Sequence, residues 1–382
     1  MSKRIPSVVS ALALVLATAL PAAAQPVTLP PSGDNQKASV SQHLGLVTVT
    51  VDYSSPDVHA PDGADRRGKS WGELVPYGWH EENFGTCGKR CPWRGGANEN
   101  TVVTVSHDVQ VEGQTLPAGR YGLFFVPGES EWTVIFSKNS TSWGHYTYSE
   151  AEDALRVTVK PEKAAYREWL TYEFTDRELD KATLSLAWEE LAVPIRIAVP
   201  NAVELYVENL RNELRSAPGF SSDGWQQAAQ YLVQQKVHLD LAEAWAQNAV
   251  SLPFIGRESF GTLKTLAEAQ AANGKADAAK ATMDKALAHA TATPLDYYQY
   301  ARPMIREGKP EQALAIFQQA AKRFPNAWPT DVGVARAYSA MGKYKEALKH
   351  ARTALVIAPD EVNRKNLERM IGLLEQGKDM NQ

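Results

Sequence analysis

A 34-residue period in the second half of the chain constrains its fold more than any other feature. Glycine recurs at that spacing and two alanine columns follow it, which gives the sets Gly274, Gly308 and Gly342, then Ala279, Ala313 and Ala347, then Ala286, Ala320 and Ala354. A period of this length with small residues in fixed columns is typical of stacked helical hairpins, because small side chains allow antiparallel helices to approach closely. We therefore predict an all-α helical solenoid over residues 224–376, preceded by a linker helix within 200–223.

The same columns resemble the tetratricopeptide repeat (TPR). Three units keep the 34-residue spacing, and Ala242, Ala246 and Ala249 form a degenerate capping unit that begins 37 residues before Ala279. The resemblance implies a right-handed array of helical hairpins, with aromatic side chains such as Phe317 in its core. It also implies that a protein or peptide partner binds in the concave groove, unless that groove docks the chain's own N-terminal domain.

Residues 1–24 have the pattern of a signal peptide. Two basic residues precede a mostly apolar stretch at 8–20, and three consecutive alanines ending at Ala24 offer a small-residue cleavage site. We expect cleavage near Ala24–Gln25 and a periplasmic or secreted mature protein. Residues 25–35 are then expected to form a flexible lead-in.

The charge balance argues against nucleic acid as a partner. The formal net charge is −4, and removal of Lys3 and Arg4 with the signal takes it to −6. A mildly acidic chain without basic clusters has no electrostatic attraction for nucleic acid or anionic lipid. No stretch after the signal approaches the roughly 20 apolar residues that a membrane-spanning helix needs, so we also expect no membrane span.

Residues 36–199 alternate apolar and polar side chains in short runs, the pattern of strands with one buried face. Turn-forming residues separate the runs, as at Glu112-Gly113 and Pro127-Gly128. Eight or nine short strands are predicted, and the clearest runs are 47–53, 101–111, 120–126, 131–137, 154–160, 169–174, 182–189 and 192–199. Strands without intervening helices favour an antiparallel β-sandwich. The expected fold class is therefore β + α in two domains, a sandwich over 36–199 followed by the TPR-like solenoid.

Six motifs in this half occur in the order of a known family. They are Gln36–Val40 (QKASV), Val49–Pro56 (VTVDYSSP), Gly72–Gly78 (GELVPYG), Trp93–Thr101 (WRGGANENT), Ala118–Phe124 (AGRYGLF) and Glu131–Phe136 (EWTVIF). Over residues 36–199 the chain thereby resembles DUF2911, a family of exported bacterial proteins classed as a domain of unknown function. The resemblance implies an exported all-β domain, in some members followed by tetratricopeptide repeats, with no established chemistry.

The chain departs from the family pattern in two places. Ser55 stands where family members tend to have the arginine of a Tyr-Ser-Arg-Pro motif, so any role of that arginine is absent here. Residues 79–92 form an insertion before Trp93-Arg94, and the insertion carries both cysteines of the chain.

The two cysteines, Cys87 and Cys91, allow three interpretations. In an oxidising compartment the pair predicts a disulfide that closes a short loop, and no cofactor is then expected. The Cys-x3-Cys-Pro spacing also resembles that of thioredoxin-like copper-delivery proteins, and with His80 upstream the two thiolates would suit copper or zinc. Reversible thiol exchange is the third interpretation.

Polar residues beside two glycines make Trp93–Thr101 a second candidate site, because such loops let backbone approach a ligand. Together with nearby aromatic residues they could form a small-ligand site for a sugar or peptide, from the set Tyr53, Tyr77, Trp93, Arg94, Asn98, Glu99 and Trp143. In the alternative interpretation Arg94 pairs with Glu99 and Asn98 caps the turn, which gives a purely structural knot.

Catalysis has little support in the sequence. The chain contains no nucleophile elbow, zinc-protease helix, phosphate loop or dinucleotide fingerprint, so no catalytic residue can be assigned. The eight histidines are scattered singly, as expected for solvated side chains. We therefore predict an exported binding or scaffolding protein rather than an enzyme. The alternative is an envelope hydrolase or a metal-handling protein with its site in the His80–Thr101 region.

Overall fold

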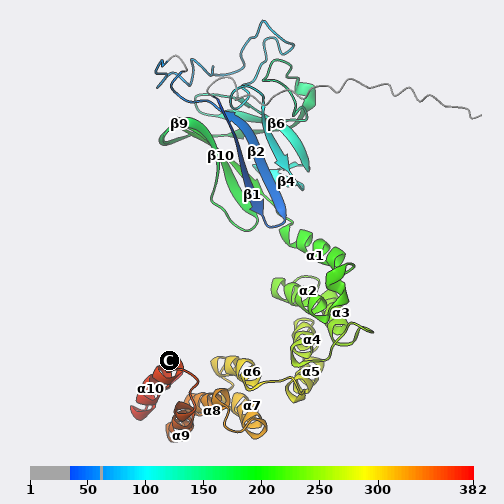
Figure 1. Ribbon diagram of the computed structural model, residues 1–382, viewed down its shortest axis with the longest axis vertical. Helices are drawn as coiled ribbons and strands as arrows, with labels where there is room; N and C mark the ends of the chain where they lie inside the picture. The colour runs from blue at the N-terminus through cyan, green and yellow to red at the C-terminus, as the bar shows by residue number, and fades with distance from the viewer. Residues whose placement is uncertain (1–34, 61–62) are drawn as a thin grey trace, which may run out of the picture. The chain divides into compact units, whose positions relative to one another are not determined.

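The computed structural model describes residues 35–60 and 63–382, and the chain divides into two compact units after Pro200. Figure 1 shows strands in the first unit and helices in the second. The predicted signal peptide at 1–24 and nearly all of the lead-in at 25–35 lie outside the described residues.

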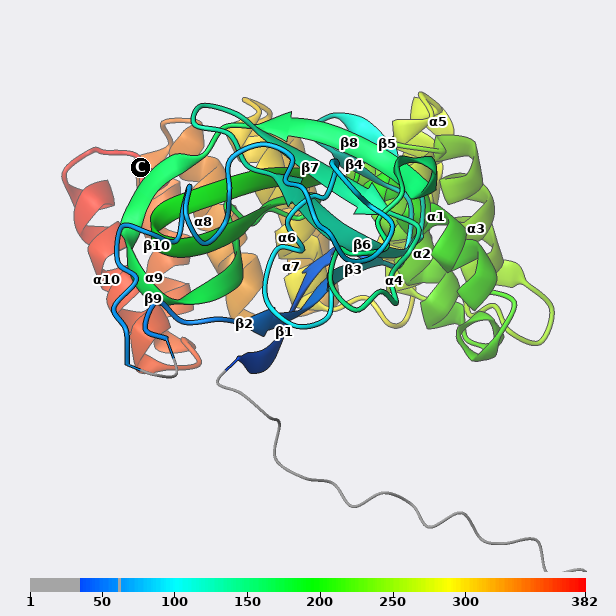
Figure 2. The same cartoon turned by 90° about the horizontal axis from the view of Figure 1, so that it is seen from above.

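The first unit consists of two antiparallel sheets, which confirms the predicted β-sandwich. The six-stranded sheet has the order β1 (Gln36–Leu44), β2 (Val47–Ser55), β3 (Thr101–Val105), β6 (Gly119–Val126), β7 (Trp132–Ser137) and β8 (Asp153–Val159). The four-stranded sheet has the order β5 (Gln114–Leu116), β4 (Val109–Val111), β10 (Lys181–Ala198) and β9 (Glu162–Thr175). The hairpin of β9 and β10, labelled in Figure 2, is the longest pairing of the unit.

Period-two alternation places one face of each long strand in the core. In β2 the side chains of Val47, Val49 and Val51 are completely buried, while the threonines between them are partly exposed. The end of β10 follows the same rule, with Val193 and Ile195 buried. Burial of branched apolar side chains on one face of the pleat stabilises these strands in their observed register.

The strand boundaries differ from the prediction at three places. The predicted strand at 101–111 is two strands, β3 and β4, which belong to different sheets. The predicted strands at 182–189 and 192–199 are one strand, β10, because the break between them is a β-bulge at Glu189, where φ is 49°. The strands β1 and β5 were not predicted.

A long irregular segment, residues 56–100, joins β2 to β3. Its described residues form turns and isolated bridges, including Trp93 with Phe125 of β6. The ring of Trp71 makes edge contacts with Trp93, Trp132 and Trp188 at centroid distances of 5.6, 5.1 and 5.5 Å. Edge-to-face packing of this kind stabilises aromatic clusters beyond their buried area. The cluster therefore fixes the segment to both sheets of the sandwich.

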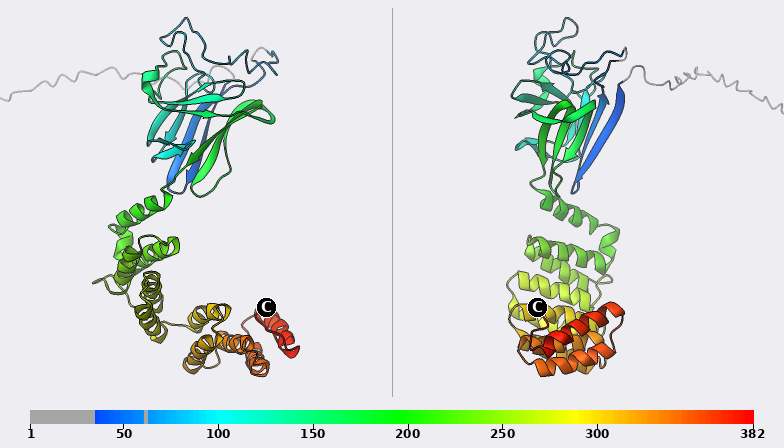
Figure 3. Two further views of the ribbon diagram at one scale, coloured as in Figure 1. Left: turned by 180° about the vertical axis from the view of Figure 1, so that it is seen from behind. Right: turned by 90° about the vertical axis from the view of Figure 1, so that its left-hand side faces the viewer.

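The second unit is a series of antiparallel helical hairpins, shown in two views in Figure 3. After α1 (Ala202–Glu213) come the pairs α2 (Ser222–Gln235) with α3 (Leu239–Ser251), α4 (Phe260–Ala272) with α5 (Ala276–Ala288), α6 (Pro294–Arg306) with α7 (Pro310–Arg323), and α8 (Trp328–Ala340) with α9 (Tyr344–Val356), followed by α10 (Glu361–Glu375). This arrangement confirms the predicted helical solenoid. Short 3-10 turns occur at Glu150–Glu152 in the first unit and at Ala217–Phe220 in the second.

The glycine column has a role in the turns of the hairpins. Gly274, Gly308 and Gly342 have φ angles of 75°, 75° and 73°, in the left-handed region that favours glycine. In each turn the next residue, a lysine, donates its backbone N–H to a carbonyl near the end of the preceding helix, at 2.8–2.9 Å. A Cβ atom at any of the three glycines would contact nothing within 4 Å. The glycines are therefore required by backbone conformation, whereas the buried alanines of the other two columns provide the close helix packing.

Candidate functional site

The cysteines of the insertion form a disulfide, as the first of the three interpretations predicts. Cys87 and Cys91 are bonded, with their Cα atoms 5.2 Å apart. The backbones of His80 and Cys91 exchange two hydrogen bonds of 3.1 Å, so the disulfide loop is attached to the strand-like stretch that carries His80. Because the two sulfurs are joined to each other, they are not thiolate ligands, and the alternative metal set of His80, Cys87 and Cys91 is not formed.

His80 instead meets a histidine and a glutamate. Its Nε2 atom lies 3.1 Å from Nε2 of His145 and 3.7 Å from Oε1 of Glu82. The distance from Nε2 of His145 to the same Glu82 oxygen is 3.2 Å. His145 belongs to the loop between β7 and β8, so the cluster joins two loops that are far apart in the sequence. We call these three residues the His-Glu cluster.

Burial makes the two imidazoles of the His-Glu cluster neutral near pH 7. The side chain of His145 is 6% exposed and that of His80 is 16% exposed. Burial lowers the pKa of His80 below its usual range. Burial, with a further contribution from the positive charge of Arg94, lowers the pKa of His145 to about 4. A neutral imidazole retains a nitrogen lone pair that can accept a hydrogen bond or bind a metal ion.

Arg94 contacts the His-Glu cluster from the neighbouring loop. Its Nε atom donates to Nδ1 of His145 at 3.3 Å, and its Nη1 atom donates to the carbonyl of Asn98 at 2.8 Å. The guanidinium also lies over the rings of Trp143 and Tyr146, at 5.6 and 5.1 Å from their centroids. These contacts hold the Arg94 side chain in one place through hydrogen bonds and cation–π attraction.

The predicted pairing of Arg94 with Glu99 is not formed. Glu99 accepts a hydrogen bond from Lys37 of β1 at 2.9 Å and one from the hydroxyl of Ser54 at 3.4 Å. The hydrogen bond from Lys37 is the main reason why the pKa of Glu99 is lowered. Asn98 does occupy a turn conformation, with φ of 56°. The loop therefore directs Arg94 and Glu99 to opposite sides.

Arg94 lines a cavity of about 490 Å³. Its polar lining includes the His-Glu cluster, Arg94 and Asn98 together with Asn35 and Arg66, and its apolar lining includes Trp93, Trp143 and Trp188. Four members of the predicted ligand set thus lie together here, namely Trp93, Arg94, Asn98 and Trp143.

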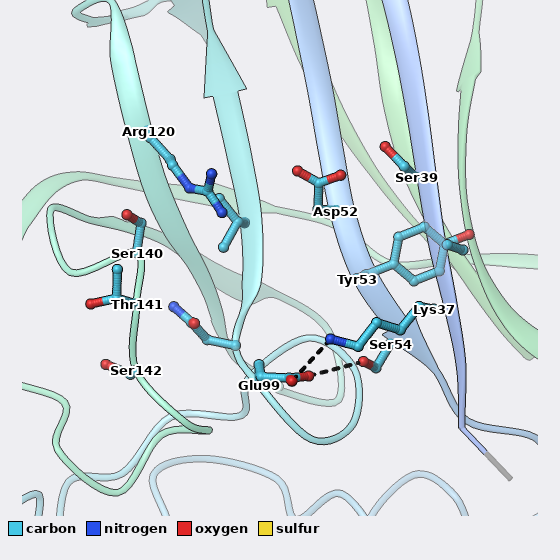
Figure 4. A pocket seen from close by; sticks show the side chains of 13 residues that line it. Lys37, Ser39, Asp52, Tyr53, Ser54, Glu99, Arg120, Ser140, Thr141 and Ser142 are labelled. Atoms are coloured by element: carbon cyan, nitrogen blue, oxygen red, sulfur yellow. Dashed lines mark hydrogen bonds and ion pairs between the residues drawn. The ribbon is translucent and has the colours of Figure 1, made fainter. Parts of the chain in front are cut away.

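The side containing Glu99 is a second hollow, of about 500 Å³, drawn in Figure 4. It contains Tyr53 and Glu99 of the predicted set, with Lys37 and Ser54 beside Glu99 and Arg120 across from them. The remaining predicted residue, Tyr77, lines neither hollow and packs beside Gly72. The predicted ligand set is therefore divided between the two hollows, and Tyr77 lies outside both.

Sequence reasoning missed Glu82 and His145. Both histidines of the cluster are largely buried, whereas single scattered histidines were expected to be solvated. Glu82 is two residues from His80, a weak local signal, but His145 is 65 residues away and nothing in the sequence links it to His80.

Comparison with known families finds one match in each half of the chain. Residues 35–197 match the DUF2911 family model. The family is described as a protein of unknown function, and a tetratricopeptide-repeat model matches residues 304–371. The two resemblances predicted from the motifs are thus confirmed, in the predicted order.

Solved structures similar to the chain include TPR proteins. YrrB, described as a TPR protein with an unusual peptide-binding site, is 16% identical, with 44% of this chain and 84% of YrrB covered and a TM-score of 0.29. The thermophilic TPR protein TTC0263 of Thermus thermophilus is 16% identical, with 46% and 92% covered and a TM-score of 0.31. The C-terminal part of a TPR protein from Cytophaga hutchinsonii is 13% identical, with 46% and 67% covered and a TM-score of 0.34. No curated protein matches the chain.

The disulfide gives a first testable prediction. Purified protein is expected to contain no free thiol, and the double variant Cys87→Ser/Cys91→Ser is expected to lose no more than about 2 kcal/mol of unfolding free energy, because the closed loop is short. Thiol titration under denaturing, non-reducing conditions and urea denaturation measure the two quantities. Two titratable thiols in the untreated protein would contradict the prediction.

Proposed function

We propose that this chain is an exported interaction protein in which the helical unit binds a segment of a partner protein and the β unit holds a small ligand. The observation that carries the proposal is the repeated hairpin of the helical unit. A TPR-like array suggests a protein-interaction scaffold, because its stacked hairpins build an extended surface without a catalytic centre.

The packing at the end of the array supports binding along its side. Leu367, Met370 and Leu374 of α10 are buried in the core formed with α8 and α9. The following residues turn back onto α8, where Ser339 donates a hydrogen bond to Asp379 at 2.7 Å and Met380 is buried. The last apolar face of the array is therefore covered, as in capped repeat proteins. A partner has the lateral surface of the helices available.

The interaction is tested by site-specific photocross-linking of the full chain. A benzophenone amino acid at Leu295, an exposed apolar residue of α6, is expected to give one reproducible adduct with an envelope protein. The matched control places the same group at Lys163 on β9, whose side chain is also well exposed. Equal adducts from both positions, or none from Leu295, would contradict the proposal.

Export is the second part of the proposal. The disulfide between Cys87 and Cys91 supports it, because such bonds persist mainly in oxidising compartments. The predicted signal at 1–24 supports it as well. N-terminal sequencing of the mature protein is expected to begin at Gln25 or within a residue or two of it. Recovery of chains that begin at Met1 from a soluble cytoplasmic fraction would refute this part.

No observation on the described residues favours hydrolysis as a second function. The part of the chain that the structure describes also has no helix long and apolar enough to cross a membrane.

A further inference from the structure

We propose that His80, Glu82 and His145 form a binding site for one divalent transition-metal ion of the zinc type. The site lies in the β unit, so the inference does not depend on partner binding by the helical unit. It rests on the spacing of three donor atoms, on the unsatisfied hydrogen bonding among them and on the cavity beside them.

The three donor atoms have the spacing of one face of a metal tetrahedron. Nε2 of His80, Nε2 of His145 and Oε1 of Glu82 are separated by 3.1, 3.2 and 3.7 Å. In a tetrahedral zinc site with metal–ligand distances of roughly 2.0–2.1 Å, neighbouring ligand atoms lie about 3.3 Å apart. An ion could therefore contact all three atoms with little movement of the side chains.

The donor types also suit such an ion. Neutral imidazole and carboxylate are usual ligands of zinc, and two histidines with one glutamate leave a fourth position open to water or a ligand. All three residues line the cavity of about 490 Å³ described above, so the open position would face that cavity. The wall of the cavity is partly aromatic, which would limit what can approach the ion.

The side chains of the His-Glu cluster do not satisfy one another's hydrogen-bonding atoms. Because Arg94 donates to Nδ1 of His145, the single proton of a neutral His145 is on Nε2. That proton faces two acceptors, Nε2 of His80 at 3.1 Å and Glu82 at 3.2 Å, and can serve only one of them well. Because Nε2 of His80 faces this proton of His145, a neutral His80 carries its own proton on Nδ1. That atom is buried and has no hydrogen-bond partner among the residues that the structure describes. The free lone pairs that converge in the cluster are favourable for a cation.

Arg94 is expected to weaken the binding of a metal ion by the His-Glu cluster. For Nε2 of His145 to bind a metal, the imidazole proton must move to Nδ1, where Arg94 now donates at 3.3 Å. Two donors cannot face each other at that distance, so the Arg94 side chain has to turn away when the ion binds. Its positive charge also lowers the affinity of the site for a cation. Removal of Arg94 is therefore expected to strengthen metal binding, which loss of a merely structural residue would not do.

The site is tested by titrating the metal-free full chain, carrying no histidine tag, with Zn²⁺ in competition with a chromophoric chelator. One Zn²⁺ per chain is expected. Glu82→Gln and His145→Gln are each expected to weaken binding at least about 10-fold, since loss of a residue that only orients a ligand already costs about 10–100-fold. Co²⁺ is expected to give the intense visible absorption of a tetrahedral site in the unchanged chain.

Matched controls separate the site from adventitious binding. Glu81→Gln removes the adjacent carboxylate, which is exposed and pairs with Lys89, and His43→Gln removes an exposed histidine of β1. Both are expected to bind Zn²⁺ like the unchanged chain, and Arg94→Met is expected to bind it more tightly. Circular dichroism of each variant checks its fold, and Glu82→Gln keeps the size of the side chain so that folding is preserved. Equal affinity in Glu82→Gln and Glu81→Gln, or weaker binding in Arg94→Met, would overturn the proposal.

Discussion

Replacement of Trp132 by alanine is expected to lower the unfolding free energy of the β unit by about 3–5 kcal/mol, the usual cost of removing a large buried aromatic side chain. Trp132 is 1% exposed, and its ring contacts Trp71, Trp93 and Phe125 at centroid distances of 5.1, 6.3 and 5.9 Å. The variant loses this burial and leaves a cavity among the remaining rings. Because Trp71 and Trp93 belong to the irregular segment 56–100, that segment is expected to loosen as well.

Urea denaturation followed by near-ultraviolet circular dichroism reports on these aromatic residues, and the signal at 222 nm reports mainly on the helical unit. We expect Trp132→Ala to shift the near-ultraviolet transition and to leave the transition at 222 nm unchanged. The matched control is Trp143→Ala, because Trp143 is exposed and packs mainly on Tyr146 and Arg94. A loss of stability as large in the control as in Trp132→Ala would mean that the cluster around Trp71 is not the core of this unit.

The sequence pattern predicts the strands whose side chains are alternately buried and exposed, and it misses the strands that lack this alternation. The residues of β1 are exposed or partly exposed along most of its length, with only Leu44 fully buried, because β1 is an edge strand of its sheet. No apolar face marks such a strand. The strand β5 is also at an edge and has three residues, too few to show a period. In β10 the bulge at Glu189 shifts the alternation, so one strand has the sequence pattern of two.

Local relationships in the site were predictable and distant ones were not. Cys87 and Cys91 are separated by four positions, so the chain brings them together whatever the surrounding fold. His145 reaches His80 only because the loop between β7 and β8 meets the insertion. Arg94 and Glu99 are close in sequence, yet the turn at Asn98 points them into different hollows. The pairing of charges near a tight turn depends on backbone direction, which the residue types alone do not reveal.

The periodic columns were located correctly, but their physical roles differ. The alanines pack between helices, and the glycines adopt a left-handed turn conformation. The 34-residue period therefore reflects two independent requirements. One is close packing between helices of the array, and the other is a tight turn between the two helices of each hairpin. A substitution can disturb either requirement separately, and the core position Phe317 tests the first.

Phe317→Ala is expected to destabilise the helical unit by about 3–5 kcal/mol. Phe317 of α7 is completely buried and packs with Ala301 of α6 and with Val334 and Ala337 of α8, so its ring joins two successive hairpins. A methyl group on Gly333 of α8 would collide with this ring, which shows how closely the two helices approach. Removal of the ring leaves a cavity at the contact between hairpins, and in a repeat array such contacts supply much of the stability.

Urea denaturation at 222 nm measures the loss, with Phe254→Ala as the matched control because that phenylalanine is fully exposed in the loop after α3. The control is expected to change the unfolding free energy by no more than about 0.5 kcal/mol, as surface substitutions usually do. The transition of Phe317→Ala is also expected to broaden or divide, since α6 and α7 would no longer be coupled firmly to α8 and α9. A single sharp transition with nearly unchanged stability would show that the 34-residue spacing does not mark the packing contacts between hairpins.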